Sequence, residues 1–154
     1  MLDGTHAYGL TLMAYYNSII QGMTITSLEA GFDVILDETF MRRIDLEKAF
    51  DLYLPYALEI AVVDLTSVSL EDCVERDARR PKPLGYKVIH EYQEELEESG
   101  ETCSIIASYV ENSIPSTLDT KISLIKLQNG HEELRSSWSM ASGKPLMDTF
   151  ATNG

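Results

Sequence analysis

The chain has 154 residues, enough for one domain with a buried core, and no second independent domain is expected. It carries 25 acidic and 12 basic residues, so its formal net charge of −13 repels polyanions at long range and disfavours general binding of nucleic acid. No apolar run approaches the ~20 residues that span a bilayer, and no secretory or transit peptide is visible, so we expect a cytoplasmic protein. Cys73 and Cys103 lack metal-binding spacing, so we expect two reduced thiols and no metal site.

The first thirty residues predict a helix. Apolar residues recur at three- and four-residue intervals at Tyr8, Leu12, Tyr15 and Ile19. One face of this helix is therefore apolar and should pack on a sheet. Gly22 is placed where it could interrupt the helix, and Gly31 where it could end the helix in a left-handed cap.

A short buried strand is predicted next, over residues 33–36. Its continuous apolar core, Val-Ile-Leu, is typical of a strand that is covered on both faces in a parallel sheet. Asp37, Glu38 and Thr39 follow at its carboxyl end, the edge of an open α/β sheet where ligands gather. The alternative interpretation is that Thr39 or Asp37 simply caps the next helix.

The following segment predicts a helix and a second buried strand. The helix carries an apolar stripe at Leu46, Ala49, Phe50 and Tyr53. A turn that contains Pro55 leads into residues 58–65, LEIAVVDL, which are typical of a longer buried strand. Strand, helix and strand with one short crossover would form a right-handed βαβ unit.

A capped helix then leads into a cluster of arginines. Ser69 opens the helix, and Asp72 three positions later completes a capping-box pattern. Pro81 and Pro83 stop the helix, so residues 79–85 are expected to form a loop. Three guanidinium groups lie at this boundary, those of Arg76, Arg79 and Arg80.

These arginines have two interpretations. Guanidinium groups at a helix–loop boundary could clamp the oxygens of a nucleotide phosphate in paired hydrogen bonds. They could instead be solvated partners of nearby acids, each pair contributing little to stability. Those acids are Glu71, Asp72, Glu75 and Asp77. The concentration of bases in so acidic a chain favours the phosphate interpretation.

The last third of the chain is predicted to be a helix followed by strands. The buried side of the helix is formed by Val88, Ile89, Tyr92 and Leu96, and Gly100 ends it. CSIIASYV and KISLIKLQ are rich in β-branched residues, and Asn129-Gly130 is a hairpin signal, so we expect two or three strands within 102–145. Gly143-Lys144 lacks the earlier glycine and the following Ser or Thr of a phosphate loop.

In their order and spacing, four segments resemble P-loop kinases of the polynucleotide kinase type, which shade into zeta-toxin-like kinases. The segments are GFDVILDETFMRR, LEIAVVDL, SLEDCVERDARRPK and GYKVIHEYQ. The resemblance implies an α/β fold with a three-layer parallel sheet and flanking helices, P-loop NTPase-like but incomplete, over residues 1–100. A β-rich C-terminal extension over 101–145 and a tail over 146–154 would follow.

The resemblance also implies a site. Glu38-Thr39-Phe40 falls on an Asp-Thr-Asn-like tripeptide of the family, with a longer acid and a phenylalanine in place of asparagine. Glu38 and Thr39 would then lie near the phosphates. Asp3 is the candidate for the general base that acts on the hydroxyl that accepts the phosphate.

The lid of the family has its counterpart in ERDARR. Arg76 and Arg80 fall on the two phosphate-contacting arginines, and Arg79 beside them is expected to bind phosphate as well. Their implied role is to offset charge on the transferred phosphoryl group as the lid closes.

The glycine-rich Lys-Ser/Thr loop of the family is absent. In the family this loop supplies backbone amides that bind the phosphates, a lysine for the β- and γ-phosphate oxygens, and a hydroxyl for Mg²⁺. ATP and Mg²⁺ are therefore expected as cofactors only if the loop is supplied. Losing one oxyanion-type donor alone costs on the order of 10²- to 10³-fold in rate. The central first strand would be missing too, leaving unpaired edges. Three explanations for the missing strand stay open. The chain is a truncated product of a longer kinase, which we favour; residues 102–127 supply the strand; or another chain supplies it.

Three functions remain open. The first is an ATP-binding kinase-like domain, truncated or degenerate, that transfers phosphate to a nucleotide, a polynucleotide end or a small hydroxyl acceptor and is inactive as this chain alone. The second is a non-catalytic binding or interaction protein that retains the fold. The third is an acidic α/β domain unrelated to kinases. Expected partners are a nucleotide, a hydroxyl acceptor, and a protein or second copy that completes the sheet, but no membrane and no nucleic acid beyond a strand end.

Overall fold

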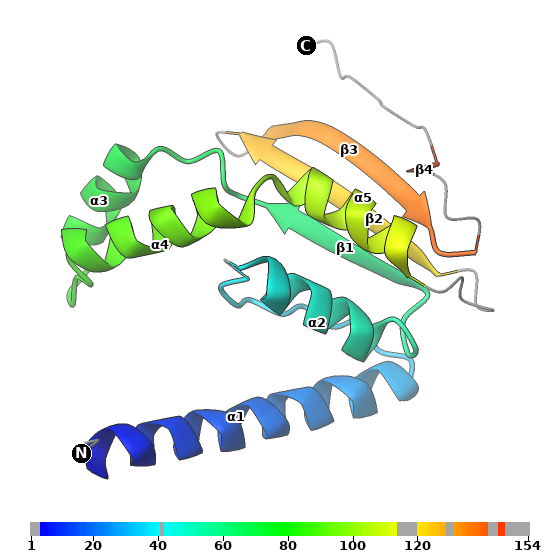
Figure 1. Ribbon diagram of the computed structural model, residues 1–154, viewed down its shortest axis with the longest axis horizontal. Helices are drawn as coiled ribbons and strands as arrows, with labels where there is room; N and C mark the ends of the chain where they lie inside the picture. The colour runs from blue at the N-terminus through cyan, green and yellow to red at the C-terminus, as the bar shows by residue number, and fades with distance from the viewer. Residues whose placement is uncertain (1–3, 41, 114–119, 129–130, 142–144, 147–154) are drawn as a thin grey trace. The chain divides into compact units, whose positions relative to one another are not determined.

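The computed structural model describes residues 4–40, 42–113, 120–128, 131–141 and 145–146 (Figure 1). The chain divides into two compact units, Met1–Glu38 and Thr39–Gly154. None of the helices in the described ranges combines the length and the apolarity that crossing a membrane requires.

The first unit is built on one long helix, α1 (Gly4–Glu29). Gly22 lies inside this helix and does not interrupt it. The helix ends at Gly31, whose φ of 83° is left-handed, and the backbone N–H of Phe32 donates to the carbonyl oxygen of Ser27 at 3.0 Å. This six-to-one bond, together with the bond from Gly31 N–H to Leu28 O at 2.9 Å, is a Schellman motif. The cap predicted at Gly31 is confirmed.

The described residues of the first unit contain no strand, so the expectation that one face of α1 packs on a sheet stays a prediction. Another prediction for this unit is wrong. Residues 33–40 form neither helix nor strand, and Ile35 is 93% exposed. An apolar run becomes a strand only when another strand accepts its backbone hydrogen bonds. No described strand pairs with this segment, so the predicted βαβ unit does not form.

The described residues of the second unit form four helices and a mixed sheet (Figure 1). In chain order the elements are α2 (Arg43–Tyr53), β1 (Glu59–Asp64), α3 (Leu70–Ala78), α4 (Tyr86–Ser99), α5 (Thr102–Asn112), β2 (Lys121–Gln128), β3 (His131–Ser139) and β4 (Pro145–Leu146). The α/β class is therefore confirmed.

The sheet has the order β1-β2-β3-β4 and is not wholly parallel, contrary to prediction. β1 pairs with β2 in parallel, from Glu59 opposite Lys121 to Asp64 opposite Lys126. β2 and β3 are antiparallel, with Gln128 opposite His131, which confirms the hairpin predicted around residues 129–130. Among the described strands β1 pairs on one side only, so it is an edge strand.

The segment CSIIASYV was predicted to be a strand and is instead the helix α5. Its buried residues, Ile105, Ile106 and Val110, recur at the spacing of one helical face. Packing of that face against the sheet outweighs the strand preference of β-branched side chains, which is a weak bias.

The core lies between the sheet and the pair α2 and α5, which cover one of its faces (Figure 1). Phe50 of α2, Ile106 of α5, and Ile122 and Leu124 of β2 are at most 1% exposed. The apolar stripe predicted for α2 is confirmed, since Leu46, Phe50 and Tyr53 are buried. From Glu59 to Val63 exposed residues alternate with half-buried ones, and Asp64 is buried, so the prediction that β1 is covered on both faces is wrong.

Candidate functional site

The segment predicted to carry a phosphate lid forms a helical hairpin of α3 and α4. The Ser69 Oγ atom accepts a hydrogen bond from the backbone N–H of Asp72 at 3.1 Å, which confirms the predicted cap of α3. Residues 79–85 form the loop between the helices, as predicted. Tyr92 of α4 is exposed, and the rest of its predicted buried side is only half-buried.

The three arginines of this hairpin are exposed, and the two that follow α3 are paired with acids of that helix. Arg79 forms an ion pair with Glu75, and Arg80 Nη1 lies 3.8 Å from an Oδ1 atom of Asp77. Within the described part of the chain the guanidinium group of Arg76 forms no hydrogen bond or ion pair, so it is the member of the cluster that is available to a ligand.

Asp77 is the buried acid of this region, only 5% exposed. Its carboxylate accepts hydrogen bonds from the backbone N–H of Leu84 at 3.0 Å and of Gly85 at 2.9 Å. These bonds, first that from Gly85 and then that from Leu84, hold the pKa of Asp77 below its usual value, and Arg80 adds to the effect. Asp77 therefore closes the loop and satisfies amides at the start of α4, a role that the sequence did not reveal.

Replacing Asp77 with Ala should open this loop. We expect the amides of Leu84 and Gly85 to exchange with solvent roughly tenfold faster or more, because a charge-assisted acceptor is lost. A lowered pKa means that the carboxylate protects these amides at any pH above ~3.9 and loses this effect as the pH falls through its folded-state pKa. Hydrogen exchange followed by NMR measures both effects.

The matched control is Asp72→Ala. The Asp72 side chain is exposed, and the hydrogen bond to Ser69 that caps α3 comes from the backbone N–H of Asp72, which the variant keeps. Equal exchange rates at Leu84 and Gly85 in the Asp77 and Asp72 variants would contradict the role assigned to Asp77.

No described strand precedes Glu38 and Thr39, two of the other predicted site residues. Asp3 lies outside the described residues. Glu38 is the exposed last residue of the first unit, and Thr39 is the exposed first residue of the second. The alternative that Thr39 or Asp37 caps α2 is wrong, because this helix begins after Arg42 and has no side-chain cap. Arg42 instead pairs with Asp45, at 2.7 and 2.8 Å.

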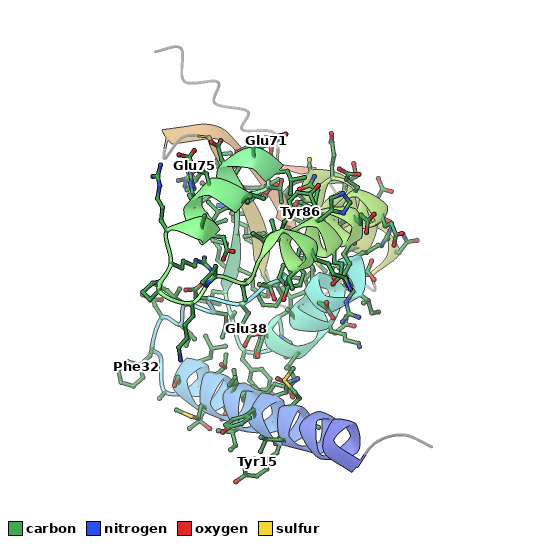
Figure 2. The ribbon with its side chains drawn as sticks, turned by 90° about the vertical axis from the view of Figure 1, so that its left-hand side faces the viewer. Tyr15, Phe32, Glu38, Glu71, Glu75 and Tyr86 are labelled. Carbon is green, nitrogen blue, oxygen red and sulfur yellow. The ribbon has the colours of Figure 1, made fainter. Side chains whose placement is uncertain are left out.

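A shallow hollow of about 350 Å³ lies between α3 and α4. Figure 2 labels three of its lining residues, Glu71 and Glu75 on α3 and Tyr86 at the start of α4. Leu70, Val74 and Ala78 complete the lining. The charged groups that line it are carboxylates, which repel a phosphate.

A larger cleft of about 680 Å³ lies between α2 and α5, and we name it the α2–α5 cleft. Its apolar lining consists of Phe50, Leu54, Pro55 and Met140. Its polar lining consists of Arg43, Glu47, Asp51, Ser108, Tyr109, Asn112 and Ser113. The volume falls within the ~300–1,000 Å³ of ligand sites, whereas seven of the eleven lining residues are polar, more than the predominantly apolar lining that is usual for such sites.

Hydrogen bonds across the cleft tie the polar groups together. The guanidinium group of Arg43 donates to Glu47 Oε1 at 2.7 Å and to Ser108 Oγ at 2.9 Å. The hydroxyl of Tyr109 donates to Asp51 Oδ1 at 2.7 Å. Burial and this bond to a carboxylate raise the pKa of Tyr109 to about 12, so the phenol keeps its proton near neutral pH. The polar lining can therefore orient a ligand, and the Tyr109 phenol itself is not a base near neutral pH.

The described part of the chain contains no group of three or more His, Cys, Asp or Glu residues that could hold a metal ion. Sequence reasoning missed the cleft because Asp51 and Tyr109 are 58 positions apart and because 102–112 was predicted as strand. The helical spacing of Ile105, Ile106 and Val110 was the signal that could have revealed it.

Comparison with known proteins found no matching family: no family model matches the chain, and neither a curated protein nor a solved structure was found to match it.

Proposed function

We propose that this chain is a non-catalytic interaction module whose partner binds in the α2–α5 cleft. The observation that carries this proposal is the cleft itself, in which the apolar residues Phe50, Leu54 and Met140 lie beside a polar rim. The rim groups hydrogen-bond to one another, and the Tyr109 phenol keeps its proton. Such an arrangement favours recognition over catalysis.

The charges of the rim favour a basic partner. Arg43 is matched by Glu47, which leaves the carboxylate of Asp51 as the uncompensated charge of the cleft. The net charge of −13 attracts cations to the whole chain. A groove between two helices accommodates an amphipathic segment. We therefore infer a protein segment that presents an apolar residue beside a Lys or Arg.

The kinase-like function remains a second proposal, and with it the likeness to a P-loop NTPase fold. The exposed Arg76, which pairs with no described residue, favours it because a phosphate could occupy its guanidinium group. The ion pairs of Arg79 and Arg80 and the acidic lining of the adjacent hollow favour the interaction module instead.

The test is a selection of short displayed peptides on the full chain, followed by calorimetry with the selected peptides. We expect these to carry an apolar residue next to Lys or Arg. Asp51→Asn should weaken their binding by up to about fivefold, the range of an exposed charge pair, because the amide keeps the bond from Tyr109 but not the charge.

Glu111→Gln is the matched control, because it neutralises an exposed acid of α5 that does not line the cleft. Peptides that bind both variants equally well would overturn the assignment of the cleft. Saturable binding of ATP–Mg²⁺ at millimolar concentration, with no peptide selected, would favour the kinase-like function.

A further inference from the structure

Around Tyr109, the α2–α5 cleft is lined by side chains whose hydrogen-bond donors are already in use. The Tyr109 hydroxyl donates to Asp51 Oδ1 at 2.7 Å. The Asn112 amide nitrogen donates to the carbonyl oxygen of Ser108 at 2.7 Å and to its hydroxyl oxygen at 3.4 Å. The Ser113 hydroxyl donates to the carbonyl oxygen of Tyr109 at 2.6 Å. A ligand at this place therefore finds few free donors.

Two acceptor atoms remain in the same part of the cleft. Among the described residues no group donates to Asp51 Oδ2 or to Asn112 Oδ1, and both side chains are exposed. The orientation of the Asn112 amide follows from its bond to a carbonyl oxygen, which can only accept, so the nitrogen is the atom that faces Ser108. One free acceptor therefore belongs to α2, and the other belongs to α5, three positions from Tyr109.

The Asp51 carboxylate is held in place by Tyr109. The phenol bonds to one carboxylate oxygen, which restrains the group and leaves Oδ2 as the oxygen that a ligand can reach. Burial, then Asp51 and to a smaller extent Glu47, raise the pKa of Tyr109 to about 12, so this bond persists at neutral pH. The surroundings of the phenol are therefore negative and rich in acceptors, which favours a cation with several donors.

A guanidinium group fits two acceptors on facing helices better than an ammonium group does. It presents several N–H donors in a rigid planar fork, whereas the ammonium group of lysine is a compact point charge. It also stacks on aromatic rings, and the half-buried Tyr109 lines the cleft. The apolar stem of an arginine can lie along Leu54 and Pro55. Arg43 is paired with Glu47, which offsets its repulsion of a second guanidinium group.

We propose that the cation recognised in the α2–α5 cleft is arginine, held between Asp51 of α2 and Asn112 of α5. This inference rests on the proposed function, because it names the residue by which the partner segment is selected. A lysine at the same position reaches Asp51 but gives up the hydrogen bond to Asn112.

Calorimetry with matched peptides tests the proposal. Each peptide selected on the full chain is made in two forms, with Arg and with Lys at its basic position. The Arg form should bind about fivefold more tightly, the worth of one additional hydrogen bond. Asn112→Ala should reduce this preference to within about twofold and leave the affinity for the Lys form unchanged. Glu111→Gln is the control, because this exposed acid beside Asn112 does not line the cleft, and it should keep the preference.

A second measurement needs no peptide. In an NMR titration, ethylguanidinium should shift the side-chain amide signals of Asn112 in a saturable way, and ethylammonium at the same concentration should shift them less. Equal binding of the two peptide forms, or a preference for Arg that survives Asn112→Ala, would overturn the inference while leaving the cleft as a binding site. If no peptide is selected, the proposed function fails, and the response of Asn112 to ethylguanidinium decides separately whether the arginine site exists.

Discussion

Phe50→Ala should lower the free energy of unfolding of the second unit by about 3–5 kcal/mol, as expected for a large aromatic side chain removed from a core. Phe50 is 1% exposed, and its ring lies 5.0 Å from the ring of Tyr109, between centroids. A domain of this size has a total stability of only ~5–15 kcal/mol, so a substantial part of it would be lost.

Urea denaturation measures this effect through the fluorescence of Trp138, which is the only tryptophan of the chain and is 6% exposed. Phe32→Ala is the matched control, because Phe32 is 67% exposed and its truncation should change stability by less than ~0.5 kcal/mol. A loss below ~1 kcal/mol for Phe50→Ala would contradict the packing of α2 against α5 and the sheet.

Leu124→Ala should cost about 2–5 kcal/mol, because it leaves a cavity under both helices. Leu124 is 1% exposed on β2, the strand that pairs with β1 on one side and β3 on the other. The experiment therefore tests whether residues 121–128 form the centre of the sheet, which the sequence did not indicate.

Leu58→Ala makes the same chemical change at a residue that is 84% exposed, directly before β1. Its effect on the free energy of unfolding, measured by the same urea denaturation, should be within ~0.5 kcal/mol of zero. Similar small losses for the two leucine variants would show that β2 is peripheral and that the parallel pairing with β1 is incorrect.

Only some features of the candidate site could be predicted from the sequence. The exposed arginines of α3 were found because they are contiguous in the chain, and their acidic partners Glu75 and Asp77 were foreseen as one of two alternatives. The burial of Asp77 could not be foreseen, since it depends on the chain returning seven and eight residues later. The α2–α5 cleft depends on residues from two distant helices.

The sequence by itself determined the features whose interactions join residues close together in the chain. The Schellman end at Gly31, the Ser69 cap, the stripe of α2 and the hairpin between β2 and β3 all follow from local dihedral preferences, nearby hydrogen bonds or helical spacing.

Only the tertiary structure decided which apolar runs became strands. Residues 33–36 and 58–65 have similar composition, but the backbone of 59–64 pairs with 121–126 whereas 33–40 has no described partner. A helix makes its hydrogen bonds to residues four positions away, while a parallel strand needs a partner far along the chain. For that reason α5 and the sheet order were settled by packing at long range rather than by propensity.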